Sequence, residues 1–519
     1  MKKLLALLMT VVMAFGMFVM TACGGNKPAS NTEADLEIFH WDAGNGSEWL
    51  RRTIAAFKEK FPEVNVIEKF SEINDSWQKE LTDTKNNTVD LYISTMTNFL
   101  AYTDYIEPLD DIFNEKWGNE SKTLLEKNDQ FILDSYRGED GKLYASTYGG
   151  GVCGIVYNKT VFDQKGYKIP RTTQELAALA GNMVDDKYTP FIHCNNADYW
   201  LYAVMPWAAQ YGGIDEVYNF WQAKYVDPET GAVSQPDIRA LTTEGREKAL
   251  EALYDVIAPD GYTYSASNQK SHTDAQTLFL SERALMMPNG SWLENEMRNT
   301  KTNIEFAFMK LPVISSLADK LGIEDDYSLA EIVSYVDSAD YAAGTVNNAS
   351  SEYDAAIINE YSKDVIDAVA EARKITYSEA ISNRAIIPNY ANGKEWAKKF
   401  IQFMNSDEAL AIYTDELHVR TTVTPTTGTV DTSKWSVFMK SADALMQNAS
   451  YVYRAKSYKL FYFSSAINEF WPSISVNYPA ADFTASNPKD QLTAGQYWQK
   501  CKTYYNSYWD SALTQAGLK

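Results

Sequence analysis

The chain has 519 residues and a formal net charge of −22 at pH 7. An acidic chain of this kind repels polyanions, which excludes nucleic acid as a partner. The four cysteines form neither a disulfide framework nor a C-x-x-C pair, and the four histidines lack metal-ligand spacing, so we expect no cofactor and no metal. The length is sufficient for two or three hydrophobic cores. The unusual part of the composition is its aromatic content, with 13 Trp and 34 Tyr.

The N-terminus has the features of a secretory signal. Lys2 and Lys3 precede an apolar run over residues 4–20, and small residues follow it, which predicts a signal peptide over residues 1–22. The sequence Met20-Thr21-Ala22-Cys23 resembles the lipobox of bacterial lipoproteins, with Met20 where leucine is usual, and this implies a lipid on Cys23. An ordinary signal peptide with a chance cysteine is the alternative. Residues 23–34 are poor in apolar side chains and are predicted to be a flexible tether, and no later segment is apolar for long enough to cross a bilayer.

Residues 36–93 alternate between strand and helix patterns. Short alternating apolar runs at residues 36–40, 64–66 and 89–93 predict strands, and apolar residues at helical spacing between them predict two helices, with Ser47 available to cap the first. This β-α-β-α-β order is typical of a parallel sheet with helices on its faces. Ligands of such sheets bind beyond the C-terminal ends of the strands, which here carry Trp41, Asp42, Thr95 and Asn98.

The stretch from Asp140 to Asn158 marks a joint between two halves of the chain. A turn at Asp140-Gly141 leads to an extended run, and Gly149-Gly150-Gly151 then lets the backbone bend or lie close to another group. Gly149, Gly151 and Gly154 also match G-x-G-x-x-G. A dinucleotide-binding loop of that kind must lead straight into a helix, whereas a strand pattern follows here, so we interpret the stretch as a flexible joint between strands.

The pattern of strands and helices starts again after the joint. Thr172-x-x-Glu175 is a capping box that predicts the start of a helix. Apolar runs at residues 284–287 and 305–308 predict strands, residues 316–393 are charged and mostly helical, and further helix patterns follow from residue 396. Cys501 lies on an apolar helical stripe in the tail and is expected to be a buried thiol.

Five segments, taken in order with the lipobox, resemble the extracellular solute-binding lipoproteins of ABC importers, the family that includes maltose-binding protein and other sugar-binding components. The resembling segments are FHWDAGNGSEWLRRTIAAFKEKFPEVNV, DGKLYASTYGGGVCGIVYNKTVFDQKGYKIPRTTQEL, ERALMMPNGSW, FAFMKLPV and NGKEWAKKFIQFMNSDEALAIY. The resemblance extends from Cys23 to about residue 420 and places the tail beyond about Asp431 only loosely.

The resemblance implies an α/β fold of two lobes, each a sheet flanked by helices, with several crossings between them. It predicts an N-terminal lobe from residues 35–147 and 314–422, with a helical insertion at 316–393, and a C-terminal lobe from residues 148–313 and 423–519. It also implies a non-catalytic monomer, lipid-anchored at the outer face of the bacterial cell membrane. This monomer closes about Tyr148–Gly154 on a carbohydrate, which we expect to be an oligosaccharide, and delivers it to ABC permease subunits served by a separate ATPase.

Sugar binding requires aromatic faces together with polar side chains. The resemblance implies that Trp292, in an Asn-Gly-x-Trp turn, stacks on the ligand, and that Tyr199 and Trp200 form an aromatic pair after Asn195 and Asn196. Position alone adds the remaining candidates, which are Trp41, Asp42, Thr95, Asn98 and Tyr148. For each aromatic candidate, a place in the core is the competing interpretation, and Tyr148 has padding of the joint as its alternative.

Two other functions use the same residue types. A secreted glycan-active enzyme would use paired carboxylates, but among 69 acidic residues no pair stands out, and no G-x-S-x-G motif is present. A surface adhesin would bind glycan with the same aromatic side chains and would not need a joint between two lobes.

Overall fold

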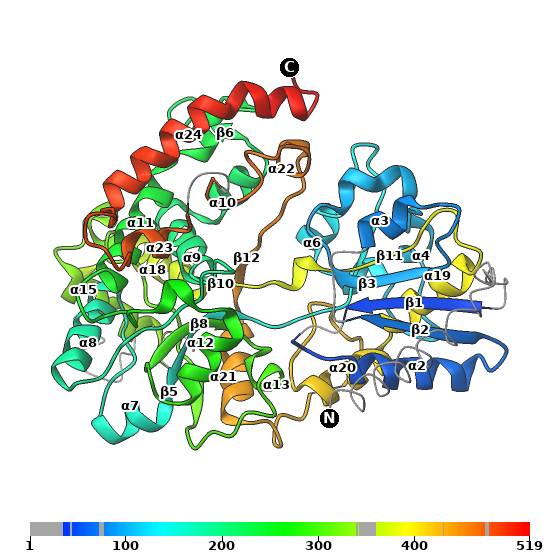
Figure 1. Cartoon of the computed structure of the whole chain (residues 1–519), viewed down its shortest axis with the longest axis horizontal. Helices are drawn as coiled ribbons and strands as arrows, with labels where there is room; N and C mark the ends of the chain where they lie inside the picture. The colour runs from blue at the N-terminus through cyan, green and yellow to red at the C-terminus, as the bar shows by residue number, and fades with distance from the viewer. Residues whose placement is uncertain are drawn as a thin grey trace, which may run out of the picture.

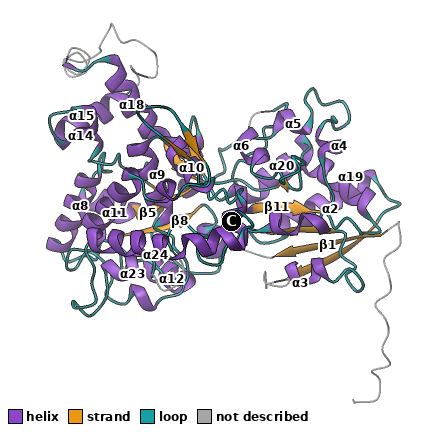
Figure 2. Cartoon of the chain, turned by 90° about the horizontal axis from the view of Figure 1, so that it is seen from above, coloured by secondary structure: helices purple, strands orange, loops and turns teal. Residues whose placement is uncertain are grey.

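A computed structural model of the chain describes residues 35–41, 44–71, 77–338, 341, 360–428, 430–472 and 477–519. These residues form two lobes, each with a β-sheet and flanking helices, as predicted (Figure 1). Figure 2 shows the same molecule from above, with helices gathered around the sheets of both lobes. The predicted signal peptide, the tether with Cys23, and Asp42 lie outside the described residues.

The first lobe contains a five-stranded sheet in the order β2-β1-β3-β11-β4. Strand β1 pairs in parallel with β2 and β3, as the β-α-β-α-β pattern predicts. Strand β11 comes from much later in the chain and runs antiparallel to β3 and β4, so the complete sheet is mixed. The strands are β1 (Asp35–Trp41), β2 (Asn65–Ser71), β3 (Leu91–Thr95), β4 (Ser146–Thr147) and β11 (Asn383–Ile386).

The helices of the first lobe bury one apolar face each. Helix α2 buries Leu50, Ile54 and Phe57, whose spacing follows the helical repeat. Ser47 occupies the expected N-cap position of α2, but its side chain makes no capping hydrogen bond. The helices are α2 (Glu48–Lys60), α3 (Trp77–Thr82), η1 (Phe99–Tyr105), α4 (Asp110–Phe113), α5 (Leu124–Lys127), α6 (Gln130–Asp134), α19 (Lys394–Met404) and α20 (Asp407–Leu417).

The second lobe has a sheet in the order β12-β10-β5-β8, with β9 also paired to β5. Strand β5 begins three residues after Gly150 and pairs antiparallel with β8, so the glycines lead into a strand and not into a helix. The strands are β5 (Cys153–Asn158), β8 (Met286–Gly290), β9 (Phe306–Phe308), β10 (Ile375–Tyr377) and β12 (Ser450–Val452), with a separate hairpin of β6 (Tyr225–Val226) and β7 (Val233–Ser234).

Most of the helices belong to the second lobe. Helix α9 is buried over residues 201–210 and occupies its centre. Thr172 accepts the expected capping bond from the backbone N–H of Glu175, although the Glu175 side chain binds Arg171. The helices are α7 (Lys159–Lys165), α8 (Thr173–Asp185), α9 (Leu201–Gly212), α10 (Ile214–Trp221), η2 (Ile238–Leu241), α11 (Glu244–Ile257), η3 (Ser267–Gln269), α12 (His272–Leu280), α13 (Leu293–Glu296), α14 (Leu317–Leu321), α15 (Asp326–Val336), α18 (Lys363–Lys374), α21 (Val437–Met446), α22 (Lys459–Phe463), α23 (Pro479–Phe483) and α24 (Ala494–Gln515).

The three cysteines within the described residues, Cys153, Cys194 and Cys501, are free and buried. Burial raises the pKa of the Cys501 thiol to about 12, which fits the expected core thiol. No helix in the described ranges is both long and apolar enough to cross a membrane.

The chain passes between the lobes three times. The first crossing joins β4 to β5, the second joins β10 to β11 and contains η4 (Ala380–Ser382), and the third follows α20. The crossings contact one another directly. Gly150 forms an antiparallel bridge with Thr421 of the third crossing, and the Ser378 hydroxyl of the second donates to the Gly151 carbonyl oxygen at 2.8 Å.

The glycine triplet is required by this close approach. A Cβ atom on Gly150 would lie 1.9 Å from the carbonyl oxygen of Arg420, and one on Gly149 would lie 2.2 Å from the Asn383 side chain. Gly151 has a φ of +108°, a conformation that other residues rarely adopt. The triplet therefore permits three backbone segments to touch, in addition to any freedom it gives the joint.

The predicted lobe boundary at residue 314 differs from the structure. Strand β10 pairs with β5 and β12 in the second sheet, and α14 and α18 pack on α9 of the same lobe. The described part of the predicted insertion, residues 316–393, is therefore divided: residues up to Tyr377 belong to the second lobe, and the chain returns to the first lobe only at β11. Pairing partners far along the chain decide this placement, and local periodicity does not contain them.

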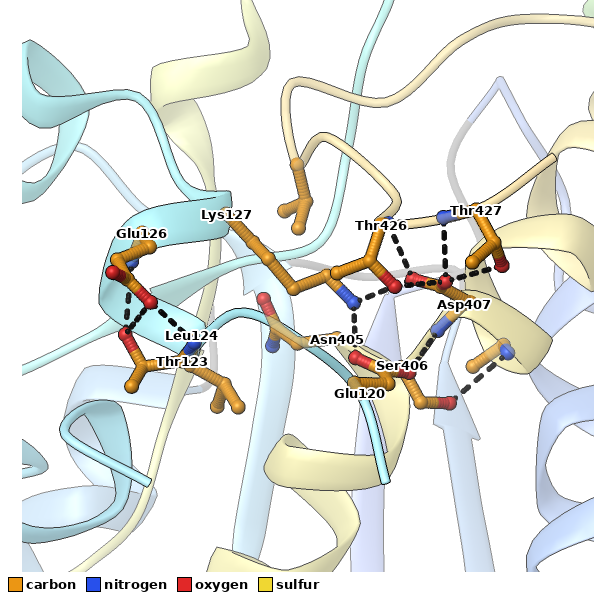
Figure 3. Close-up of polar contacts among 12 residues, drawn as sticks. Glu120, Thr123, Leu124, Glu126, Lys127, Asn405, Ser406, Asp407, Thr426 and Thr427 are labelled. Atoms are coloured by element: carbon orange, nitrogen blue, oxygen red, sulfur yellow. Dashed lines mark hydrogen bonds and ion pairs between the residues drawn. The ribbon is translucent and has the colours of Figure 1, made fainter. Parts of the chain in front are cut away.

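A buried ion network fixes the third crossing to the first lobe (Figure 3). The ammonium of Lys127, at the end of α5, is fully buried and contacts Glu120 at 2.7 Å and Asp407 at 2.9 Å. Asp407 also accepts hydrogen bonds from the backbone N–H groups of Thr426 and Thr427. Burial opposes ionisation of Asp407, but hydrogen bonds from the Thr426 hydroxyl, from Lys127 and from the Thr426 backbone outweigh it and hold the pKa of its carboxyl well below the usual range. Residues 424–427 thus remain on the first lobe before the chain enters α21.

We predict that Lys127→Met lowers the free energy of unfolding by about 3 kcal/mol, because it leaves two largely buried carboxylates without their cation. Lys60→Met is the matched control, since Lys60 of α2 forms an exposed ion pair with Glu408, which lies beside Asp407 in α20. This substitution should cost less than about 1 kcal/mol. Urea unfolding followed by circular dichroism measures both. Equal losses in the two variants would contradict a structural role for the buried network.

Candidate functional site

A pocket with a volume of 280 Å³ lies in the second lobe beside the second crossing. Its walls combine aromatic and charged side chains from the start of α9, from the residue that precedes η4, and from the tail after β12. The lining residues are Asn196, Ala197, Asp198, Tyr199, Leu201, Tyr202, Glu379, Arg454, Glu469, Phe470, Trp471 and Tyr478.

One wall of the pocket is aromatic. The rings of Tyr199 and Tyr202 are stacked, with centroids 5.1 Å apart, and Tyr202 lies 4.9 Å from Tyr377. The Trp292 ring meets Tyr199 and Tyr202 edge-on at 6.3 Å and 6.1 Å. On its other side Trp292 faces the first lobe, because a Cβ atom on Gly44 would lie 3.1 Å from the Trp292 ring. Trp292 therefore lies between the aromatic wall and the loop that follows β1.

Another wall contains a partly buried charged group, in which only Lys456 is fully buried. Glu469 contacts Lys456 at 2.5 Å and Arg454 at 3.5 Å, so one carboxylate serves two cations. The attraction of Glu469 is the main cause that raises the pKa of Arg454, and burial lowers the pKa of Lys456. Trp471 beside this group has an indole N–H that is buried and has no partner among the described residues. This wall thus offers fixed donors and acceptors to the pocket.

Glu379 is held in place on the second crossing. One of its carboxylate oxygens accepts from the Tyr377 hydroxyl at 2.8 Å, and the other accepts from the Ser382 hydroxyl at 3.0 Å. Because these donors fix its orientation, Glu379 presents a preorganised acceptor to the pocket from the segment that joins the two lobes.

Asp198 lacks a comparable partner. It forms no ion pair with another described residue, and burial together with repulsion from Glu469 raises the pKa of its carboxyl to about 7. The neutral form of Asp198 can donate a hydrogen bond and the ionised form can only accept. Among the described residues, no group of three or more His, Cys, Asp or Glu side chains could hold a metal ion.

The structure places the predicted residues of the second lobe in different environments. Tyr199 lines the pocket and Trp292 lies beside it, whereas Asn195 is exposed and its neighbour Asn196 takes the place in the lining. The prediction that Trp200 binds ligand is wrong, because its side chain is 1% exposed and its ring packs 5.5 Å from Phe191 in the core.

The described residues predicted for the first-lobe side of the site do not line the pocket. Tyr148 stacks on Trp49 at 5.5 Å and packs against the core, and its role in binding stays a prediction. Trp41 is half-buried at the end of β1, Thr95 donates to the Asn383 side chain at 3.2 Å, and Asn98 precedes η1. Asp42 lies outside the described residues, so its role stays a prediction.

Sequence reasoning missed much of the polar lining. Asp198 and Glu379 are single acidic residues without a motif, and Arg454 and Glu469 lie in the tail that the resemblance does not place. The run Phe470-Trp471 is a local signal in that tail, but an ambiguous one, because large aromatic side chains are frequent both in cores and in sugar sites.

Two lobes joined by three crossings, with a pocket beside the junction, define a two-lobed binding protein. Residues 43–411 match the family described as bacterial extracellular solute-binding protein, and the chain belongs to that family. The chain is 22% identical over 297 residues to the multiple sugar-binding protein of Streptococcus mutans and 28% identical over 226 residues to the diacetylchitobiose binding protein NgcE of Streptomyces coelicolor.

These two alignments span 57% and 43% of this chain, and 66% and 44% of the relatives. The chain thus covers less than two thirds of the length of either curated relative. Among solved structures, a probable secreted solute-binding lipoprotein from Streptomyces coelicolor matches with a TM-score of 0.59 and 14% identity, covering 92% of this chain and 99% of that one. At this identity the match supports the fold.

We predict that Asp198→Asn reduces the pH dependence of stability. The folded-state pKa of about 7 is above the unfolded value near 3.9, so the folded state holds the proton more tightly and Asp198 makes the protein less stable as pH rises between these values. The parent should therefore lose about 3 kcal/mol more than the variant between pH 4.5 and pH 8.

Melting temperatures at the two pH values test this effect. Asp260→Asn, at an exposed position, controls for the change in net charge. The expectation fails if parent and Asp198→Asn melt with the same pH dependence.

Proposed function

We propose that the protein is the substrate-binding component of an ABC importer and that its pocket binds a carbohydrate, in particular part of an oligosaccharide. The observation that carries this proposal is the pairing of an aromatic wall with a wall of fixed carboxylate, guanidinium and amide groups at the junction of the lobes. A pyranose has an apolar C–H face that packs on an aromatic ring and hydroxyl groups that both donate and accept. The names of the two curated relatives, each a sugar-binding protein, support the same ligand class.

The state of the carboxylates supports binding without catalysis. A glycosidase needs one carboxyl as an acid and a second, free carboxylate as base or nucleophile. Asp198 has the raised pKa of an acid, but Glu469 is paired with two cations and Glu379 is held by two hydroxyls. Neither is free to attack, so both serve as acceptors. The three crossings likewise favour a binding protein with two lobes over an adhesin.

We expect the mature protein to be a monomer tethered through Cys23 to the outer face of the bacterial cell membrane. There it would deliver its ligand to permease subunits served by a separate ATPase. The signal-like N-terminus with Thr-Ala-Cys motivates the anchor, and the family's description as extracellular agrees with the location.

Replacing the lipidated side chain should release the protein. Cys23→Ser removes the thiol that would carry the lipid, so we predict that the variant leaves the detergent phase in Triton X-114 partitioning while the parent stays in it. Cys501→Ser, a change at a buried thiol, is the control and should partition like the parent. A Cys23→Ser protein that still partitions into detergent would refute the anchor.

A thermal-shift screen of residues 24–519 against di- to pentasaccharides tests the ligand class. A sugar present at a hundredfold its Kd should stabilise the protein by about 2.7 kcal/mol. Chromatography of the recovered sugar separates binding from catalysis, since a binding protein returns it intact. A hydrolysed sugar, or no shift with any sugar while a peptide library gives one, would overturn the proposal.

Titration with the sugar found by this screen distinguishes the binding role proposed for Trp292 from the core role of Trp200. Trp292→Ala should weaken binding by about 2 kcal/mol, roughly thirtyfold, while leaving the melting temperature nearly unchanged. Trp200→Ala should instead lower stability by about 3–5 kcal/mol, because Trp200 is a core residue. Calorimetric titration and thermal melts of both variants measure the contrast. Normal affinity and a low melting temperature in Trp292→Ala would assign Trp292 to the core.

A further inference from the structure

Three aromatic rings form a stack that joins the two lobes. Phe131 of α6, in the first lobe, lies 4.0 Å from Tyr218 of α10 and 5.6 Å from Tyr453, which follows β12 in the second lobe. The interplanar angles are 26° and 14°, so both contacts are face to face. We call Phe131, Tyr218 and Tyr453 the interlobe stack.

The second lobe holds its two rings rigidly. The Tyr218 hydroxyl donates to the backbone oxygen of Tyr451 in β12 at 2.5 Å, and Tyr453 is buried. Tyr453 immediately precedes Arg454, which lines the pocket. Tyr453 therefore ties the interlobe stack to the charged wall of the pocket, since Tyr453 and Arg454 both belong to the segment between β12 and α22, which runs toward the first lobe in Figure 1.

Other contacts join the lobes on both sides of the pocket. Beyond the stack, Lys459 of α22 contacts Glu139 at 3.2 Å, although Glu139 is 65% exposed. On the side of Trp292, the Asn295 side chain donates to the Gly44 carbonyl oxygen at 2.7 Å. The two lobes thus contact each other on two sides of the pocket, through stacked rings on one side and through the loop against Trp292 on the other.

The stack combines two rings from the region of the family match with one ring from the tail. The family match ends at residue 411, whereas Tyr453 and the β12 residue that binds Tyr218 come later.

We propose that the interlobe stack is a latch that holds the two lobes together on one side of the pocket before any sugar arrives. Opening the lobes on this side exposes three apolar ring faces to water, so the contact favours the closed arrangement independently of ligand. The lobes then separate mainly on the side of Trp292, which makes that side the entrance for the sugar.

Small-angle X-ray scattering of the full mature chain without sugar tests the latch. Phe131→Ala in the first lobe and Tyr218→Ala in the second should both increase the radius of gyration relative to the parent. Because the two changes lie in different lobes, a shared increase cannot come from local unfolding of one of them. Thermal melts confirm that each variant still unfolds cooperatively.

Three variants serve as matched controls and should scatter like the parent. Tyr218→Phe keeps the ring and loses only the hydroxyl. Tyr508→Ala removes a stack of similar geometry, 4.4 Å and 27° from Tyr504, but within one helix. Glu139→Gln breaks the exposed ion pair alone, which contributes little.

An unchanged radius in Phe131→Ala and Tyr218→Ala, with both variants folded, would overturn the latch. An increase in the radius of gyration of Glu139→Gln as large as that of Phe131→Ala would also overturn it, because the ion pair would then hold the lobes together. These measurements contain no sugar, so their outcome is independent of the ligand class proposed above.

Discussion

The arrangement of the two lobes depends on the close approach of three backbone segments at their junction. Gly149, Gly150 and Gly151 present no side chains, so the third crossing lies directly against the first and pairs with it through Thr421. The second crossing joins them through the Ser378 hydroxyl. Each segment continues into a strand or a helix of both lobes, and this contact therefore sets where the pocket wall at Glu379 lies relative to both sheets.

The pocket shows how buried charge is accommodated in such a junction. Glu469 pairs with two cations, and its attraction raises the pKa of Arg454, whereas burial lowers the pKa of Lys456. Asp198 faces the same carboxylate without a cation of its own, and its pKa rises as a result. The walls thus contain an ion-paired carboxylate beside one carboxyl, Asp198, whose pKa of about 7 lets it change its hydrogen-bonding character near neutral pH.

The large aromatic content serves several physical purposes in this chain. Trp49 and Trp200 fill the two cores, Tyr199 and Tyr202 form a wall of the pocket, and Phe131 bridges the lobes. Adjacent residues can differ completely, as Tyr199 and Trp200 do, because successive side chains on a turn point in different directions. An aromatic pair in the sequence therefore has one member available for the core and one for the site.

The sequence by itself determined the local elements and the joint. Apolar spacing located β1, α2, β3, α15 and α19, because the repeat of buried positions is a local property of strand and helix, and the glycine triplet marked the first crossing. Only the tertiary structure decided that the described residues between 317 and 377 belong to the second lobe, since β10 finds its partners in β5 and β12. It also decided that Trp200 is core, and that Arg454 and Glu469 from the tail complete the pocket. These outcomes depend on contacts between segments far apart in the chain, and such contacts leave no periodic trace in any one of them.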